Sequence, residues 1–112
     1  LMRHGFWLIE EKAGGRFLGE GGFGAFKREI DPPFDAPEQG WAFAPHAHGQ
    51  GFAYEAMSAA IRWGEDRFKR GDFVCLIAPE NAPSLKLAGK LGYREYGRAP
   101  YRGEPSVQLR RA

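Results

Sequence analysis

The alternation of hydrophobic and polar residues predicts two β-strands at the start of the chain. Residues 5–12, "GFWLIEEK", alternate and are rich in aromatic and β-branched side chains, which favours a strand. The adjacent glycines of "AGGR", residues 13–16, predict a hairpin turn. Residues 16–30 then form a second long strand pattern, and its four glycines indicate a bulge or close packing.

A third strand and the longest helix follow a proline-rich loop. Residues 31–37, "DPPFDAP", predict a loop because adjacent prolines cannot join a β-ladder. Residues 38–45, "EQGWAFAP", predict a strand that Pro45 ends, and since proline has no N–H we expect the sheet to splay there. Residues 52–70 predict a helix that Gly71 ends. Its apolar face is expected to contain Phe52, Ala56, Ala59, Ala60, Trp63 and Phe68.

The remaining segments predict a buried strand, a short helix and a final hairpin. The apolar run "FVCLIA", residues 73–78, is typical of a central strand covered on both faces. Residues 79–93 predict a turn and a short helix that Gly92 ends, and residues 93–102 and 104–111 predict two strands. The order β-β-β-α-β-α-β-β predicts an α/β or α+β fold, a sheet with helices packed on it.

Composition narrows the classes of function. A chain of 112 residues forms one domain at most. Its 16 basic and 14 acidic residues are too balanced to argue for a nucleic-acid partner, although the basic residues gather after Arg62 and suit an anionic small ligand. The single cysteine, Cys75, excludes an internal disulfide and is expected to be buried and inert. No apolar run approaches the roughly 20 residues of a membrane span, so a cytoplasmic location is the default expectation.

The candidate chemistry begins in "HAHGQGFAYEA", residues 46–56, between the third strand and the long helix. Gly49 and Gly51 allow a sharp turn and present backbone N–H groups beside those of the first helical turn, where the helix dipole also favours an anion. A P-loop is excluded because Gly51 is followed by Phe52, and a dinucleotide fingerprint is excluded because Tyr54 occupies the place of a small residue.

The two histidines of this loop offer a weaker alternative. His46 and His48 lie two residues apart with no third ligand type nearby, so a loop position near phosphates is favoured over a zinc site. We therefore expect no metal.

Taken together, these segments resemble the GNAT superfamily of acyltransferases. The superfamily's acetyl-coenzyme A loop has the form Arg/Gln-x-x-Gly-x-Gly/Ala at the start of a helix, and here it would span His46 to Gly51, with histidine in place of arginine or glutamine. "GFAYEA", "NAPS" and "KLGY" resemble more closely the branch that contains ribosomal-protein N-terminal acetyltransferases. The matching positions are Gly49, Gly51, Phe52, Ala53, Glu55, Ala56, Asn81, Ser84, Leu91, Gly92 and Tyr93.

This resemblance implies a mixed, largely antiparallel sheet that is splayed at the cofactor-binding strand. Residues 1–112 would be a single GNAT domain that lacks the family's first strand and first two helices. The resemblance also implies acetyl-coenzyme A (acetyl-CoA) as co-substrate and a primary amine as acceptor, on a protein N-terminus or a small molecule. A homodimer is compatible with it; neither a membrane nor a nucleic acid is expected as a partner.

The cofactor residues follow from the resemblance and from the predicted splay. Free backbone groups on the third strand would pair with the pantetheine amides like a missing strand, and the glycine loop would hold the pyrophosphate. The expected cofactor-binding residues are Trp41, Ala42, Phe43, Ala44, His46, His48, Gly49, Gln50, Gly51, Phe52, Ala53, Asn81 and Ser84.

Two residues are candidates for catalysis. Glu38, at the start of the third strand, would act as general base toward the ammonium form of the acceptor, or would be a solvated charge at a strand end. Ser84 would give a proton to the departing thiolate, or would be an ordinary serine of a first helical turn. Asn81 would bond the pantetheine arm or serve turn chemistry, and Tyr93 is expected in the core.

Two rival functions remain open. A catalytically inactive domain of the same fold could bind acyl-coenzyme A as a sensor or interaction module. A nucleic-acid or ribosome-associated module could instead use the basic C-terminal half. The sequence does not identify the acceptor amine.

Overall fold

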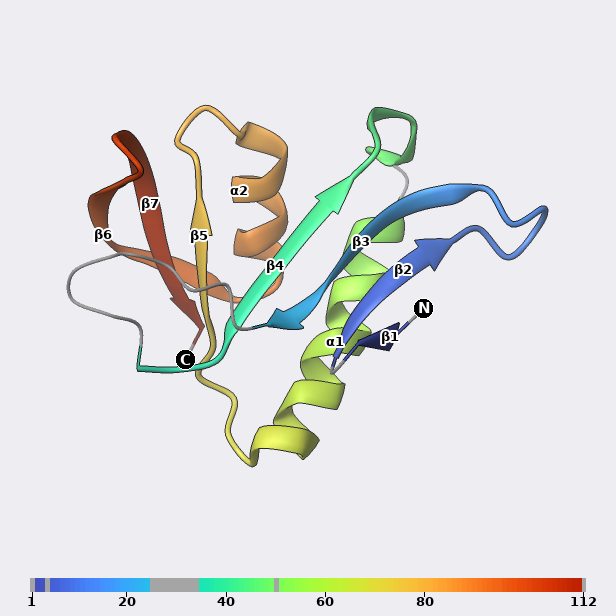
Figure 1. Ribbon diagram of the computed structural model, residues 1–112, viewed down its shortest axis with the longest axis horizontal. Helices are drawn as coiled ribbons and strands as arrows, with labels where there is room; N and C mark the ends of the chain where they lie inside the picture. The colour runs from blue at the N-terminus through green and yellow to red at the C-terminus, as the bar shows by residue number, and fades with distance from the viewer. Residues whose placement is uncertain (1, 4, 25–34, 50, 112) are drawn as a thin grey trace.

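The computed structural model describes residues 2–3, 5–24, 35–49 and 51–111, which build one sheet and two α-helices (Figure 1). The elements in chain order are β1 (Met2–Arg3), β2 (Phe6–Glu10), β3 (Phe17–Gly24), β4 (Glu38–Phe43), a short 3₁₀ helix η1 (Pro45–Ala47), α1 (Phe52–Phe68), β5 (Val74–Ile77), α2 (Ala82–Lys90), β6 (Tyr93–Tyr101) and β7 (Glu104–Arg111).

The sheet has seven strands in the order β1-β2-β3-β4-β5-β7-β6. Within the described residues every neighbouring pair is antiparallel except β4 and β5, which are parallel. The predicted mixed, largely antiparallel sheet is therefore confirmed. Strand β1 and helix η1 were not predicted, because two or three residues are too few to show a period. The part of the second predicted strand beyond Gly24, residues 25–30, lies outside the described residues.

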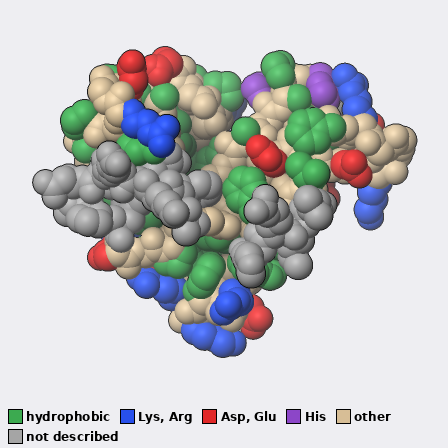
Figure 2. All heavy atoms as spheres, in the orientation of Figure 1, with side chains coloured by type: hydrophobic (Ala, Val, Ile, Leu, Met, Phe, Trp, Pro, Cys, Tyr) green, Lys and Arg blue, Asp and Glu red, His purple; other side chains and the backbone are tan. Residues whose placement is uncertain are grey.

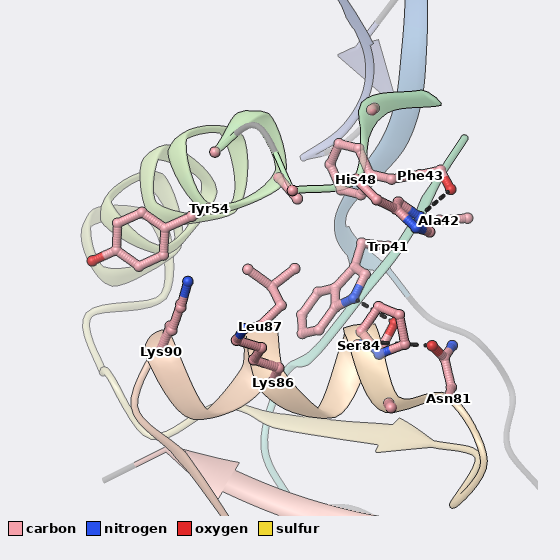
Figure 3. A pocket seen from close by; sticks show the side chains of 16 residues that line it. Trp41, Ala42, Phe43, His48, Tyr54, Asn81, Ser84, Lys86, Leu87 and Lys90 are labelled. Atoms are coloured by element: carbon pink, nitrogen blue, oxygen red, sulfur yellow. Dashed lines mark hydrogen bonds between the residues drawn. The ribbon is translucent and has the colours of Figure 1, made fainter. Parts of the chain in front are cut away.

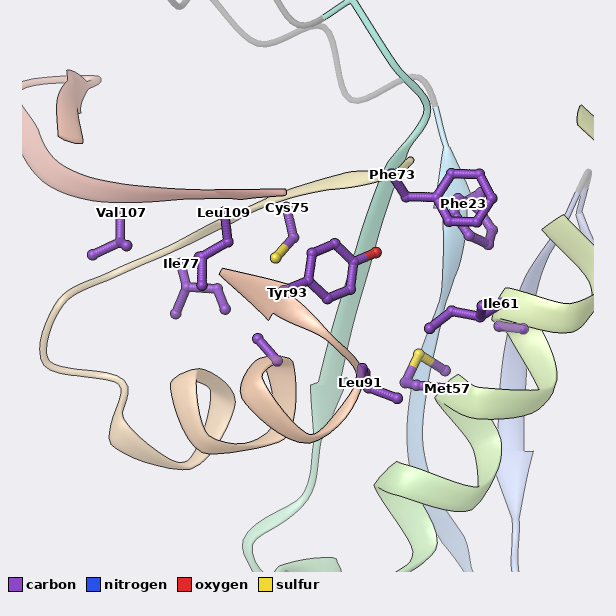
Figure 4. Close-up of a cluster of buried hydrophobic side chains, with 12 residues drawn as sticks. Phe23, Met57, Ile61, Phe73, Cys75, Ile77, Leu91, Tyr93, Val107 and Leu109 are labelled. Atoms are coloured by element: carbon purple, nitrogen blue, oxygen red, sulfur yellow. The ribbon is translucent and has the colours of Figure 1, made fainter. Parts of the chain in front are cut away.

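The hydrophobic core lies between the sheet and both helices (Figure 4). Met57 and Ile61 of α1 and Ala88 of α2 are buried in it. Burial of apolar surface is the main stabilising contribution to such a layered fold. Cys75 is buried as expected, and burial raises the pKa of its thiol, which keeps the group protonated and inert. Among the described residues, no helix is long and apolar enough to cross a membrane.

A glycine of β3 permits the close contact between the sheet and α1. A Cβ built on Gly21 would lie 2.7 Å from the Cε atom of Met57, a distance that real Cβ contacts do not reach. A larger residue at this position would require the end of the Met57 side chain to move. The predicted close packing of the glycine-rich strand is thus confirmed.

Helix α1 differs from its prediction at its end and in its buried face. It ends at Phe68 rather than before Gly71, because Lys69 adopts the left-handed conformation (φ 58°) and its N–H donates to the Glu65 carbonyl at 3.0 Å. Ala59 is exposed, so its place on the apolar face was wrong. The fully buried face consists of Met57, Ala60, Ile61 and Gly64.

Candidate functional site

The site begins where β4 and β5 separate. The register between these strands consists, for the described residues, of the single pair Glu38–Val74, and the N–H of Val74 donates to the Pro37 carbonyl at 3.0 Å. On its other edge β4 pairs with β3 along its whole length. The predicted splay is confirmed, but its predicted cause is wrong. The strands part directly after Glu38, whereas Pro45 lies beyond the end of β4 and begins η1.

Backbone alternation decides which groups of β4 face the gap. The N–H of Ala44 donates to the Leu18 carbonyl at 2.8 Å, so its peptide group points toward β3. The prediction that the backbone groups of residues 41–44 are all free to pair with a ligand is therefore wrong for the Ala44 N–H. In a strand the N–H and C=O of one residue point to the same edge, and those of the next residue point to the opposite edge, which places the backbone N–H and C=O of Trp41 and Phe43 on the edge that faces β5.

A pocket of about 660 Å³ occupies the space beside this open edge. Figure 2 shows the molecule hollowed at the top of the view, with histidines on one rim, and Figure 3 shows the pocket from close by. Residues of β4, the η1–α1 loop, α1 and α2 line it: Trp41, Ala42, Phe43, Ala47, His48, Gly49, Gly51, Ala53, Tyr54, Asn81, Ala82, Pro83, Ser84, Lys86, Leu87 and Lys90.

The glycine loop meets the pocket at the start of α1. Gly49 (φ 75°) and Gly51 (φ 81°) are in the left-handed region, which glycine adopts without strain. A Cβ at either position would meet no atom within 4 Å, so the surface above the loop is open. Gly51 caps α1 without any side-chain hydrogen bond, and the N–H groups of Phe52 and Ala53 have no partner within the helix. This arrangement fits an anionic group such as a pyrophosphate.

The two loop histidines bond to different strands. His48 Nε2 lies 3.1 Å from the Phe43 carbonyl and His46 Nε2 lies 2.9 Å from the Phe17 carbonyl. Because a carbonyl oxygen can only accept, each Nε2 carries a proton and donates. His48 lines the pocket and His46 does not. The described residues contain no group of three His, Cys, Asp or Glu side chains that could hold a metal ion.

Ser84 and Trp41 form a hydrogen bond across the pocket. The indole Nε1 donates to the Ser84 hydroxyl oxygen at 3.2 Å, which leaves the serine proton available to a further acceptor. The Ser84 backbone N–H donates to Asn81 Oδ1 at 3.3 Å, so Asn81 is the N-cap of α2. Asn81 therefore serves as a helix cap, which is neither of the two roles predicted for it, and it also lines the pocket.

Glu38 lies at the first residue of β4, away from the pocket lining. It is only 6% exposed, so the alternative of a solvated strand-end charge is wrong. The next residue, Gln39, donates from Nε2 to the Met57 carbonyl of α1. Because side chains alternate along a strand, Glu38 points to the sheet face opposite the helices, at the point where β4 and β5 begin to part.

Tyr93 belongs to the core rather than to the site. Its hydroxyl donates to Gln39 Oε1 at 2.6 Å, and burial raises its pKa, which keeps it protonated. The expectation that it packs in the core is confirmed.

The structure brings together most of the predicted cofactor residues. Nine of them line the pocket: Trp41, Ala42, Phe43, His48, Gly49, Gly51, Ala53, Asn81 and Ser84. Ala44, His46 and Phe52 do not, and Gln50 lies outside the described residues.

Sequence reasoning missed the α2 side of the pocket. Lys86, Leu87 and Lys90 line it, as does Tyr54 of α1. The signal was present, since the two lysines lie four residues apart and therefore on one side of the predicted helix, with Leu87 one turn from Ser84.

Comparison with known proteins agrees with this geometry. Residues 2–94 match the acetyltransferase (GNAT) domain family, and the chain belongs to this family. It is 34% identical over 86 residues to the uncharacterized protein YkkB of Bacillus subtilis (strain 168). The matched segment covers 77% of this chain and 48% of YkkB.

Solved structures show the same fold. A Bordetella pertussis protein assigned to the GNAT acetyltransferase family superimposes with a TM-score of 0.85 at 38% identity, covering 96% of this chain and 65% of that one. The ribosomal-protein-S5-alanine acetyltransferase of Vibrio fischeri superimposes with a TM-score of 0.77 at 20% identity, and the match covers 95% of this chain and 60% of that protein's chain. The chain thus spans about half to two thirds of the length of these relatives.

Proposed function

We propose that the protein transfers an acetyl group from acetyl-CoA directly to a primary amine, with residues 1–112 as part of a single acetyltransferase domain. The observation that supports this most is the meeting of three features in one pocket. These are the open edge of β4, the start of α1 with N–H groups that have no partner within the helix, and the Ser84 hydroxyl.

Each part of the pocket suits one part of the co-substrate. The backbone N–H groups from Gly49 to Ala53 bind the pyrophosphate, and the peptide groups of Trp41 and Phe43 pair with the pantetheine amides. Acetyl-CoA supplies an activated thioester, whose carbonyl carbon the amine attacks. Ser84 then gives its proton to the thiolate that leaves when the C–S bond breaks, and it regains a proton from the nitrogen of the new amide, directly or through water.

The acceptor amine must lose protons during the reaction. An ammonium group is not a nucleophile, so a base has to take one proton before the attack on the thioester. We assign this role to Glu38, acting directly or through water. This assignment is supported by the position of Glu38, which lies where β4 and β5 separate, on the sheet face opposite the helices and the pocket.

Binding is the first test. Calorimetry of the folded, full-length gene product with coenzyme A (CoA) is expected to show one site, and weaker binding by the Gly51→Ala variant. A folded sample that binds no CoA would overturn the proposal.

Turnover separates an enzyme from a sensor of the same fold. Thiol release from acetyl-CoA is measured over a panel that includes peptides with a free N-terminus and small-molecule amines. We expect release with at least one amine, a lowered kcat for Ser84→Ala, and no change for Ser58→Ala, a control serine on α1 outside the pocket lining. Binding without release with every amine would identify a sensor instead.

A further inference from the structure

The proposed reaction uses the backbone of Trp41 but not its side chain. The indole Nε1 donates to the Ser84 hydroxyl oxygen at 3.2 Å, between residues 43 positions apart in the sequence, and Figure 3 shows the ring nitrogen turned toward the serine. Trp41 belongs to β4 and Ser84 to α2, so the bond exists only once the site has folded. It places an N–H donor on the oxygen that loses its proton in the reaction.

The core holds the indole in this position. The ring of Trp41 lies beside that of Tyr93, with the ring centroids 6.4 Å apart and the planes at 60°, and it packs against the buried core cluster. Its partner in the register of β3 is Gly21, where a Cβ would lie 2.9 Å from the Cβ of Trp41. Close packing of this kind restricts a side chain to few rotamers. The N–H donor is therefore in place before any ligand binds.

The hydroxyl of Ser84 is oriented by this donor. A serine in a helix can turn its proton back to the carbonyl four residues earlier, here that of Glu80. Within the described residues the Ser84 hydroxyl donates no hydrogen bond of this kind. Because the indole N–H occupies one side of the oxygen, the hydroxyl proton has to point in another direction. The Ser84 backbone is fixed as well, since its N–H donates to Asn81 Oδ1 at 3.3 Å.

The same bond becomes stronger while the proton is being transferred. As the Ser84 proton moves to the leaving thiolate, negative charge develops on the serine oxygen. A hydrogen bond to a charged acceptor is roughly twice as strong as one between neutral groups. A donor that is already aimed at developing charge lowers the barrier, because it does not have to reorganise during the reaction. When Ser84 regains a proton from the amide nitrogen, the bond returns to its neutral strength.

We propose that Trp41 is a positioning residue for Ser84, whose indole N–H orients the hydroxyl and stabilises the charge on its oxygen during proton transfer. This inference rests on the proposed function, because it assumes that Ser84 protonates the thiolate. Its consequence is a division between rate and binding: loss of the indole N–H lowers kcat and leaves the affinity for CoA unchanged.

The first test compares Trp41→Phe with the wild type as full-length proteins. Thiol release is measured with acetyl-CoA and the amine that gives the fastest release, and CoA affinity is measured by calorimetry. We expect kcat to fall about tenfold, less than the roughly hundredfold loss for a donor on the reacting oxygen itself, because Trp41 acts through Ser84. Trp63→Phe is the matched control, since Trp63 is a partly buried core tryptophan outside the pocket lining. Its kcat should stay within about twofold of the wild type.

An isostere separates the hydrogen bond from the packing of the ring. Phenylalanine is smaller than tryptophan, so Trp41→Phe also removes contacts with Tyr93 and the core. Benzothienylalanine incorporated at position 41 keeps both fused rings and has sulfur in place of the N–H. This variant should unfold at the wild-type Tm and still show the loss of kcat.

A second background tests whether Trp41 acts through Ser84. In the Ser84→Ala protein the indole has no hydroxyl oxygen to bind, so adding Trp41→Phe should change kcat by less than about twofold. A purely structural role of the ring would cost the same factor in both backgrounds.

The outcomes separate the inference from the proposed function. Equal losses in the two backgrounds, an unchanged kcat of Trp41→Phe, or a wild-type kcat of the isostere overturns the inference and leaves the proposed function intact. An unchanged kcat of Ser84→Ala overturns the role of Ser84 and the inference with it. A folded wild type that releases no thiol with any amine overturns the proposed function itself.

Discussion

Replacing Tyr93 with phenylalanine removes one hydroxyl group from the core and leaves a buried acceptor without its donor. The Tyr93 hydroxyl donates to Gln39 Oε1 at 2.6 Å, and Gln39 Nε2 donates to the Met57 carbonyl at 3.3 Å. Gln39 is 1% exposed and Tyr93 is 3% exposed, so water cannot replace the lost donor without rearrangement. This network connects β6, β4 and α1 beneath the strand that borders the pocket.

The size of the effect follows from this burial. An unsatisfied buried acceptor costs about 1–3 kcal/mol, and each kcal/mol lowers the Tm of a domain of this size by about 4 °C. Tyr93→Phe should therefore lower the Tm by about 4–12 °C. Gln39→Leu should be similarly destabilising, because it leaves the Tyr93 hydroxyl unpaired. The double variant removes both polar ends and should be more stable than the sum of the single effects implies.

Urea unfolding of the wild type, both single variants and the double variant measures this coupling. The expected interaction energy is at least about 0.5 kcal/mol, so the double variant should lose less unfolding free energy than the sum of the two single losses. The reasoning is refuted if the two single effects simply add, or if Tyr93→Phe unfolds at the wild-type midpoint.

Three further predictions concern the ends of α1 and one surface ion pair. Gly51→Ala places a Cβ at φ 81°, which should cost about 1–2 kcal/mol in unfolding free energy and weaken CoA binding; an unchanged Tm in calorimetry would contradict it. Lys69→Gly relieves a left-handed lysine at φ 58° and should raise the free energy of unfolding by about 1 kcal/mol, and with it the urea midpoint. A lower midpoint would contradict this. The hydrogen bond from Arg70 lowers the pKa of Asp72 to about 2 from 3.8. The ionised carboxylate therefore stabilises the fold above pH 4, and this contribution disappears as the pH falls toward 2. The Tm difference between wild type and Asp72→Asn should shrink over that range, and a constant difference would exclude this explanation.

The sequence was most informative where the pattern was local. The alternation of β2, the apolar run of β5 and the glycines of the α1 entrance each depend on a few neighbouring residues, and each predicted element is present. The left-handed Lys69 was not predictable in this way, because nothing in its residue type favours that conformation and Gly71 offered a stronger stop signal.

Tertiary contacts decided the features that were missed. Glu38 lies between β3 and β5 and is buried, which the sequence around it does not reveal. Lys86 and Lys90 belong to the pocket only because α2 packs beside α1 and β4. Their spacing showed that they share a helix side, but not which element that side faces.

Within the described residues, one residue pair between β4 and β5 connects two groups of paired strands in the sheet. One group contains β1 to β4 and the other contains β5, β7 and β6, so the backbone of the sheet resists bending within each group more than between them. An elongated ligand that pairs with β4 in the gap would stiffen the connection between these two groups of strands. Hydrogen exchange at the Trp41 and Phe43 amides should then be fast in the free protein and slow strongly on ligand binding, while amides at the β6–β7 pairing change little. Ligand binding in the gap would therefore also make the sheet more rigid between β4 and β5.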